Sequence, residues 1–385
     1  MRVLIAFDKF KEALTALEAC EAAAAALRLR CPDVEIDLCP LADGGDGFAE
    51  VLTHSTRGET TELSVIGPRG EPVPASFGSI AWSAIPAAAR ARLQLDQIPN
   101  RIAVLEMATA SGLALVRPEE RDPWRATSIG TGELIRAAEE NGAECILLGV
   151  GGSATIDLGL GALAALGWRF LGTDGTPVMP PIPARFDSIS RVVAPRTHRL
   201  PPIRIACDVT NPLLGENGAT TIYGPQKGLR PEDRNRLEAT IARMASSLCE
   251  QMNMPLSLLD LPGAGAAGGT GFGFMIAAGA KLVSGSDFIA EWLELDRRVA
   301  KADLILTGEG RFDATSLAGK GPGAVIRRAA AAGKPVRVLA GNHDLLATLD
   351  PLVELHRITP PNTKTADALA HCREFLVAKV DEIFA

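Results

Sequence analysis

The chain has 385 residues and a formal net charge of −7. This length favours two domains of roughly 150 residues or more, each with its own core. The acidic balance excludes a basic surface for nucleic acid, and no apolar run reaches the roughly 18 residues that span a membrane.

The cysteines and the N-terminus indicate a cellular compartment. The seven cysteines form no C-x-x-C pair, which is typical of reduced thiols. The first residues, MRVLIAFDKF, lack the long apolar region and cleavage site of a signal peptide. We therefore expect a cytoplasmic protein, and nothing in the sequence specifies its oligomeric state.

The first hundred residues change from one pattern to another. Arg2 to Phe7 is a compact apolar run that predicts a strand, Ala13 to Leu29 has helical spacing, and Val34 to Leu38 predicts a second strand. This order is typical of a parallel, right-handed β-α-β unit. Glu62 to Ser79 has short alternating segments broken by GPRG and PVP, which predicts antiparallel hairpins.

From Arg101 onward, strands and helices alternate. Strands are predicted at 103–108, 145–150, 203–207, 303–307, 336–340 and 352–358, and helices at 132–140, 159–167, 231–249, 271–280, 324–332 and 345–349. The predicted fold is α/β: a discontinuous Rossmann-like parallel-sheet domain, 1–70 plus 285–385, with an inserted second mixed α/β domain, 71–284. We expect the active site in the cleft between them.

Polar residues follow five of the predicted strands directly. They lie in FDKFK, LADGGDG, GVGGSATIDLG, CDVTNP and TGEGRFD. Ligands of open parallel sheets bind beyond the carboxyl ends of the strands. The aspartates of LADGGDG, Asp43 and Asp46, have two interpretations: they cap the next helix, or they hold a metal or a proton beside glycines that approach an anion.

Three glycine-containing loops are further candidates. GVGGSAT, Gly149 to Thr155, precedes a helix and suits an anion, or it only packs that helix on a strand. GAGAAGGTGFG, Gly263 to Gly273, has two interpretations. It forms a turn, approaches a neighbouring segment closely or moves, or it is only a flexible linker. YGPQKG, Tyr223 to Gly228, contains a lysine suited to phosphate, or one that only meets solvent.

Several common catalytic motifs are absent. The sequence has no G-x-x-x-x-G-K-[ST], H-R-D, D-F-G, H-E-x-x-H or G-x-S-x-G. Acidic groups, lysines and glycine loops without a Ser–His or Cys–His pair favour metal-assisted phosphoryl transfer over covalent hydrolysis.

Taken in order, the motifs resemble the bacterial glycerate kinase family of the first type. FDKFKEALTA, CPLADGGDG, EMATASGL, ATSIGTGELI, GVGGSAT, ACDVTNPLLG, YGPQKG, PGAGAAGGTGFG and TGEGRFD carry this resemblance over nearly the whole chain. It implies a two-domain α/β enzyme that phosphorylates glycerate with ATP and Mg²⁺, usually to 2-phosphoglycerate. Glycerate is the expected small-molecule partner.

The resemblance also implies site residues. The expected catalytic residues are Asp43, Lys11 and Asp208; the expected substrate and ATP ligands are Gly44, Gly45, Asp46, Gly151, Gly152, Ser153, Thr155, Asn211, Lys227, Gly268, Gly269, Arg311 and Lys320; the expected metal ligands are Asp43, Glu309 and Asp313. Asp43 is expected to act as base or metal ligand, and Lys11 and Lys227 to neutralise phosphate or the substrate carboxylate.

The chain departs from the family at several polar positions. Ile129 replaces a usual Tyr, Ile156 a usual Asn and Thr315 a usual Gln, and the family's Ser-Phe-Lys-Gly-Ser is Lys-Phe-Lys-Glu-Ala here, from Lys9 to Ala13. If Ile129 and Ile156 face the acceptor, the substrate differs from glycerate; if they face the core, the change is silent. The alternatives to a glycerate kinase are a kinase of another small hydroxy acid and a non-catalytic sensor of nucleotides or sugar acids.

Overall fold

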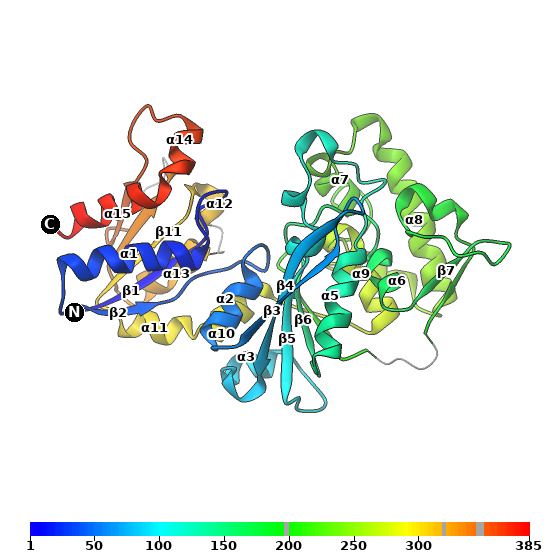
Figure 1. Ribbon diagram of the computed structural model, residues 1–385, viewed down its shortest axis with the longest axis horizontal. Helices are drawn as coiled ribbons and strands as arrows, with labels where there is room; N and C mark the ends of the chain where they lie inside the picture. The colour runs from blue at the N-terminus through cyan, green and yellow to red at the C-terminus, as the bar shows by residue number, and fades with distance from the viewer. Residues whose placement is uncertain (196–199, 318–320, 344–349) are drawn as a thin grey trace. The chain divides into compact units, whose positions relative to one another are not determined.

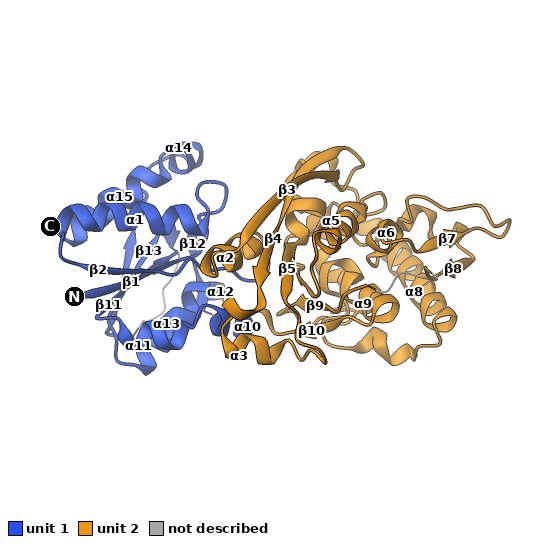
Figure 2. Ribbon diagram, turned by 60° about the horizontal axis from the view of Figure 1, so that its bottom comes forward, with its two compact units in different colours: residues 1–43, 286–385 blue, residues 44–285 orange. Residues whose placement is uncertain are grey.

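The computed structural model describes residues 1–195, 200–317, 321–343 and 350–385 (Figure 1). The chain is mixed α/β, as predicted, and its residues group into two compact units (Figure 2). The first unit contains Met1–Asp43 and Ser286–Ala385, and the second contains Gly44–Gly285. Residues 44–70, which the sequence-based division assigned to the first domain, group with the second unit.

A five-stranded parallel sheet forms the centre of the first unit. Its strand order is β15 (Val353–Arg357), β13 (Val336–Ala340), β11 (Leu304–Gly308), β1 (Arg2–Phe7) and β2 (Glu35–Leu38). β1 is fully buried from Val3 to Phe7. A continuous apolar run is typical of a parallel strand that is covered on both faces.

Helices lie on both faces of this sheet (Figure 2). α1 (Ala16–Arg30) and α15 (Cys372–Ile383) share one hydrophobic core with β1, while α11 (Leu295–Lys301) and α13 (Gly321–Ala331) contact each other and β1. α1 starts with a capping box, in which the Glu18 N–H donates to Thr15 Oγ1 and the Thr15 N–H donates to Glu18 Oε2. The unit is completed by α10 (Gly285–Trp292), which begins at the unit boundary, and by α12 (Ala314–Leu317), α14 (Thr365–Ala370), β12 (Arg311–Phe312) and β14 (Asn342–His343).

The second unit contains a six-stranded mixed sheet. Its order is β10 (Lys281–Val283), β9 (Ile203–Ala206), β6 (Ile146–Gly149), β5 (Arg101–Glu106), β4 (Pro72–Ala81) and β3 (Glu59–Ile66). The first four strands are parallel, whereas β4 is antiparallel to both β5 and β3. The antiparallel hairpin predicted over Glu62 to Ser79 is therefore confirmed.

The helices of the second unit enclose a large apolar core. The core draws on α5 (Ile129–Glu140), α6 (Leu160–Ala165), α7 (Ala219–Tyr223), α8 (Arg234–Gln251) and α9 (Ala266–Ala278). The remaining elements are α2 (Phe48–Ser55), α3 (Ala87–Arg92), α4 (Met107–Ser111) and a small ribbon of β7 (Arg169–Leu171) and β8 (Arg191–Val193). The helix predicted at 345–349 lies outside the described residues. None of the helices within the described ranges is long and apolar enough to cross a bilayer.

The glycine-rich segment at the start of α9 packs against another backbone segment. Ala267, Gly268 and Gly269 have left-handed φ angles inside α9, so the helix is kinked there. A Cβ atom on Gly268 would lie 2.1 Å from the carbonyl oxygen of Thr155. Glycine is required because the two segments approach too closely for a side chain. Of the interpretations left open for this segment, the structure supports close approach.

Gly268→Ala is expected to lower the melting temperature more than Gly279→Ala, which is a matched control. Both glycines are left-handed, with φ of +67° and +61°, so both substitutions cost about 1–2 kcal/mol in backbone conformation. Gly279 has no atom within 4 Å of the added Cβ, whereas Gly268 faces Thr155. Thermal unfolding followed by circular dichroism measures the difference; equal shifts would show that close approach is not the reason for Gly268.

Candidate functional site

The strand order of the first unit creates a crevice between β1 and β11. The chain leaves β1 through α1 towards β2 on one side, and it leaves β11 through α13 towards β13 on the other side. Where neighbouring crossovers diverge in this way, the carboxyl ends of the two strands border an open crevice, which is the usual ligand site of such sheets. Asp8 follows β1 and Glu309 follows β11, so two carboxylates lie at this point.

A cavity of about 480 Å³ lies at these strand ends, entirely within the first unit. It brings together four of the predicted site residues, Lys11, Asp43, Glu309 and Arg311. Its lining also includes Asp8 and Lys9, which belong to the FDKFK segment but were not among the expected site residues. Outside the selected segments it includes Asn342, Arg357, Thr359, Thr363 and Thr365. Apolar surface comes from Phe10, Ala13, Ala368, Leu369 and Cys372.

The ion pairs of Lys9 connect two carboxylates of this cavity. Lys9 Nζ lies 3.6 Å from Asp43 Oδ1 and 4.0 Å from Asp8 Oδ1. The turn that follows contains Glu12, which has a left-handed φ of +64°. Glycine is the favoured residue in that conformation, and glycine is what the resembled family has at this position.

Glu309, an acid that lines the cavity, has a raised pKa. Burial raises the pKa of Glu309 to about 7, a hydrogen bond from Ser316 opposes the rise, and the charges of Asp8, Asp313 and Asp43 add to it. Glu309 Oε1 is buried and has no hydrogen-bond partner among the described residues. A buried carboxylate oxygen of this kind is unstable without a proton or a cation.

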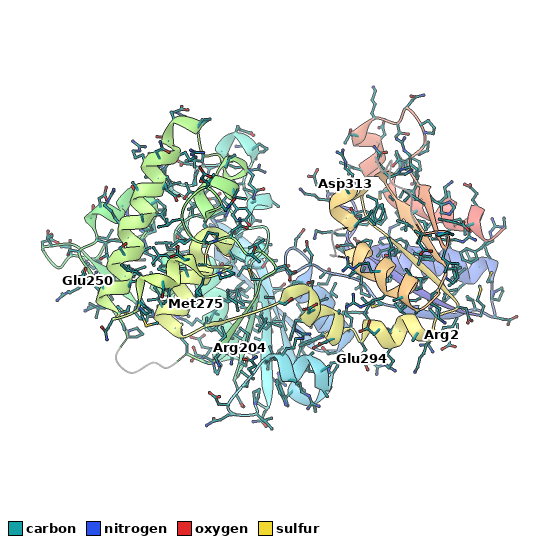
Figure 3. All side chains as sticks on the ribbon, turned by 180° about the vertical axis from the view of Figure 1, so that it is seen from behind. Arg2, Arg204, Glu250, Met275, Glu294 and Asp313 are labelled. Carbon is teal, nitrogen blue, oxygen red and sulfur yellow. The ribbon has the colours of Figure 1, made fainter. Side chains whose placement is uncertain are left out.

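Asp313 and Lys320 are the remaining predicted residues of the first unit. Asp313 lies beside α12 (Figure 3), and its Oδ2 is 3.9 Å from Arg311 Nε. It does not line the cavity, although its charge acts on Glu309. Lys320 lies outside the described residues.

In the second unit, three predicted residues form one buried group. Lys227 is 2% exposed, and its Nζ donates to Ser153 Oγ at 2.9 Å and to the Thr155 carbonyl oxygen at 2.8 Å. Burial lowers the pKa of Lys227 to about 7, partly offset by the charge of Asp157. The interpretation of Lys227 as a solvated loop lysine is therefore wrong.

The glycines of LADGGDG pack against GVGGSAT within the second unit. The Gly151 N–H donates to the Gly44 carbonyl oxygen at 3.1 Å. A Cβ atom on Gly151 would lie 2.5 Å from Gly45 Cα. Close packing of two backbones explains these glycines, while Gly152 and Asp46 are exposed and accessible to a ligand.

The CDVTNP and YGPQKG motifs are joined by a hydrogen bond. Tyr223, the only tyrosine of the chain, donates its OH to Asn211 Oδ1 at 2.6 Å, and Asn211 Nδ2 donates to the Asn217 carbonyl oxygen at 2.8 Å. Asp208 is half-buried after β9, where Ser284 Oγ lies 3.5 Å from its Oδ1. Asn211 therefore orients the loop that contains Asp208.

Comparisons with known proteins identify the family of this chain. A family model described as the glycerate kinase family matches residues 3–385. The chain belongs to the glycerate kinase family. It is 37% identical over 390 residues to the glycerate kinase of Bacillus subtilis, covering 100% of this chain and 97% of the relative. It is 38% identical over 345 residues to glycerate 2-kinase of Escherichia coli, covering 89% and 85%.

A solved structure from the same family has a similar fold. It comes from Salmonella typhimurium LT2, is described as a candidate glycerate kinase 2, and matches with a TM-score of 0.77 and 36% sequence identity. The match covers 100% of this chain and 97% of that chain. The family resemblance derived from the ordered motifs is therefore confirmed.

Burial explains one of the positions at which this chain departs from the family. Ile156 is fully buried in the apolar core of the second unit, so the loss of the usual Asn at this position is a change in the core. Ile129 is half-buried at the start of α5. Of the two interpretations, the one in which the substitution faces the core and leaves the substrate unchanged therefore applies to Ile156.

The acids of the first-unit cavity fit a magnesium ion that arrives with phosphate. Within the described ranges, no group of three or more His, Cys, Asp or Glu side chains is arranged to hold a metal ion. Mg²⁺ usually takes one or two carboxylates and completes its shell with water and substrate phosphates. The unpartnered Oε1 of Glu309 is suited to one such position.

Glu309→Gln is expected to stabilise the ligand-free protein at alkaline pH. Folding raises the pKa of Glu309 from 4.5 to about 7, so the unfolded chain loses this proton first and the free energy of unfolding falls as pH rises through that window. Gln does not titrate, so its melting temperature should exceed that of the native protein above pH ~7 and match it below pH ~5.

The matched control is Glu21→Gln, which changes an exposed carboxylate on α1. Thermal unfolding of the three proteins across this pH range measures the effect. A Glu309→Gln protein whose advantage does not grow with pH would contradict the raised pKa.

Proposed function

We propose that the protein is an ATP-dependent kinase that transfers a phosphoryl group to D-glycerate and forms 2-phosphoglycerate. Membership of the glycerate kinase family supports the acceptor. The name of the E. coli relative, glycerate 2-kinase, supports the 2-position. The observation that carries the proposal is the charged cavity at the carboxyl ends of β1 and β11, where lysines and carboxylates meet.

The same cavity supports a site for ATP. Its volume of about 480 Å³ lies in the range of roughly 300–1,000 Å³ that is usual for small-molecule sites. Lys9, Lys11 and Arg311 would oppose the charge of the phosphates, while Ala368 and Leu369 offer apolar surface to a base. A cavity lined by both charged and apolar side chains suits the phosphates and the base of a nucleotide.

We infer a role for the charged side chains that are expected to form the site. Asp43 accepts the proton of the acceptor hydroxyl or binds the metal, and Lys11 neutralises phosphate. Asp43, Glu309 and Asp313 are the side chains that would hold Mg²⁺, and the ion would supply positive charge to offset that of the phosphates. The remaining proposed ligands are Gly44, Gly45, Asp46, Gly151, Gly152, Ser153, Thr155, Asn211, Lys227, Gly268, Gly269 and Lys320, with Asp208 as a further catalytic residue.

The domain organisation is also a proposal. We infer that the first unit is a Rossmann-like domain interrupted by the second unit, with boundaries near 43 and 286. All seven cysteines are free thiols, which supports the proposed cytoplasmic location. That both units contribute to one active site stays a prediction.

A coupled assay of ADP release tests the function. The native protein, ATP and Mg²⁺ are mixed in turn with D-glycerate, L-glycerate, lactate and glycolate. Fastest release with D-glycerate is expected. Faster release with another acid would favour a kinase of a different hydroxy acid, and binding of ATP and glycerate without release would favour a sensor.

Asp43→Asn is expected to lower kcat by about 10² or more, because a group that acts as base or metal ligand contributes at least that in the transition state. Asp33→Asn, an exposed change in the same unit, is the control. Steady-state kinetics measure kcat, and unfolding curves check the fold. Near-normal kcat in Asp43→Asn would contradict the proposed role.

A further inference from the structure

The second unit contains a small cavity of about 290 Å³ beneath which Lys227 is buried. Apolar surface comes from Leu113, Val116, Ala126 and Ala154. The charged lining residues are Arg69, Glu120, Arg121, Asp122, Arg125 and Lys227. The cavity is smaller than the first-unit cavity of about 480 Å³ and suits a ligand smaller than a nucleotide.

Two of the four cations that line this cavity are paired with its two acids. Arg69 Nη1 lies 2.5 Å from Glu120 Oε2, and Arg125 Nε lies 3.7 Å from Asp122 Oδ2. Glu120 has a second partner, Arg117, outside the cavity. Neither acid is therefore available to the other two cations.

Arg121 and Lys227 have only neutral hydrogen-bond acceptors among the described residues. Arg121 Nε lies 3.4 Å from the Val116 carbonyl oxygen, and its Nη1 lies 3.3 Å from the Gln226 carbonyl oxygen. Lys227 Nζ uses two of its three donors on Ser153 Oγ and the Thr155 carbonyl oxygen. Two basic side chains thus line one cavity without a carboxylate partner among the described residues.

Asp157 does not neutralise Lys227 directly. Its carboxylate accepts hydrogen bonds from Ser128 N, Ser128 Oγ, Gly159 N and Gly161 N, and no ion pair within 4.0 Å joins it to Lys227 in the described part of the chain. A buried ammonium group without a paired anion is costly unless a ligand supplies one.

We propose that this cavity binds the carboxylate of the acceptor acid, between the Lys227 ammonium and the Arg121 guanidinium. The inference rests on the proposed function, since it assigns a place to the carboxylate of glycerate. The volume suits a three-carbon acid, and the guanidinium is the side chain best shaped for a carboxylate. The hydroxyl groups of the acid are left for other contacts.

Binding of the acid in this cavity is coupled to protonation of Lys227. The pKa of Lys227 is lowered to about 7 by burial in the free protein, and a carboxylate beside it raises that pKa again. The acid therefore binds with uptake of a proton at pH values above about 7, and its affinity falls as the pH rises. The other charges around the cavity, Arg69, Glu120, Asp122 and Arg125, remain in ion pairs throughout.

Isothermal titration calorimetry of the full chain tests this inference. D-Glycerate is titrated near pH ~8 in two buffers of different ionisation enthalpy, which reports proton uptake, and the Kd is measured between pH ~7 and ~9. The native protein is expected to take up close to one proton per acid and to bind at least about tenfold more weakly at the highest pH.

Two variants test the contributions of Lys227 and Arg121 separately. Lys227→Met should weaken binding at neutral pH about tenfold or more and should abolish proton uptake and the pH dependence. Arg121→Met should also weaken binding but should keep the proton uptake. Melting temperatures confirm that both variants fold, and Met is the residue expected to be tolerated in place of a buried, unpaired lysine.

Three probe ligands define what the cavity recognises. Lactate, which keeps the carboxylate, should bind with proton uptake, whereas glycerol, which lacks it, should not. Inorganic phosphate should bind more weakly than lactate; tighter binding that depends on Lys227 would show a phosphate site and overturn the assignment. Native-like Kd and proton uptake in Lys227→Met would also overturn it.

The outcome is separable from that of the kinase assay. Lys227-dependent uptake of a proton with glycerate, but no ADP release, would leave the carboxylate site standing and refute the kinase. ADP release with glycerate, but no effect of Lys227→Met on Kd or proton uptake, would leave the kinase standing and refute the carboxylate site.

Discussion

The reversal of crossover direction between β1 and β11 is the constraint on which the first-unit site depends. It places the residues that follow two neighbouring, largely buried strands beside one crevice, and those residues include Asp8 and Glu309. Burial, with the nearby negative charges of Asp8, Asp313 and Asp43, then raises the pKa of Glu309 to about 7. An enzyme that neutralises phosphate through a divalent cation needs such a place, where carboxylates are held close before the cation arrives.

Each unit contains a buried group at its candidate site whose ordinary charge is disfavoured, an acid in the first unit and a base in the second. Burial shifts the pKa of Glu309 upwards and the pKa of Lys227 downwards, both to about 7. These shifts reduce the stability of the free protein near neutral pH, and a bound cation or anion offsets them. Ionisable groups with strongly shifted pKa values concentrate at functional sites, because binding and catalysis use charged groups that are shielded from solvent.

The sequence predicted the elements that local patterns determine. β1 and β11 were found because a buried parallel strand is a continuous apolar run, and the rule on strand ends selected Asp43 and Glu309. Arg357 and Asn342 were missed because they become neighbours of the site only when β13 and β15 take their places in the sheet. The packing role of Gly268 was also not readable, since it depends on Thr155, more than one hundred residues earlier.

The central claim is that this chain makes 2-phosphoglycerate from D-glycerate and ATP. Phosphorus NMR of a reaction that contains the native protein, Mg²⁺, ATP and D-glycerate tests it most directly, because the spectrum identifies the product and the position of its phosphate. The account predicts equal amounts of ADP and 2-phosphoglycerate. Formation of 3-phosphoglycerate, or of inorganic phosphate with no phosphorylated acid, would contradict it.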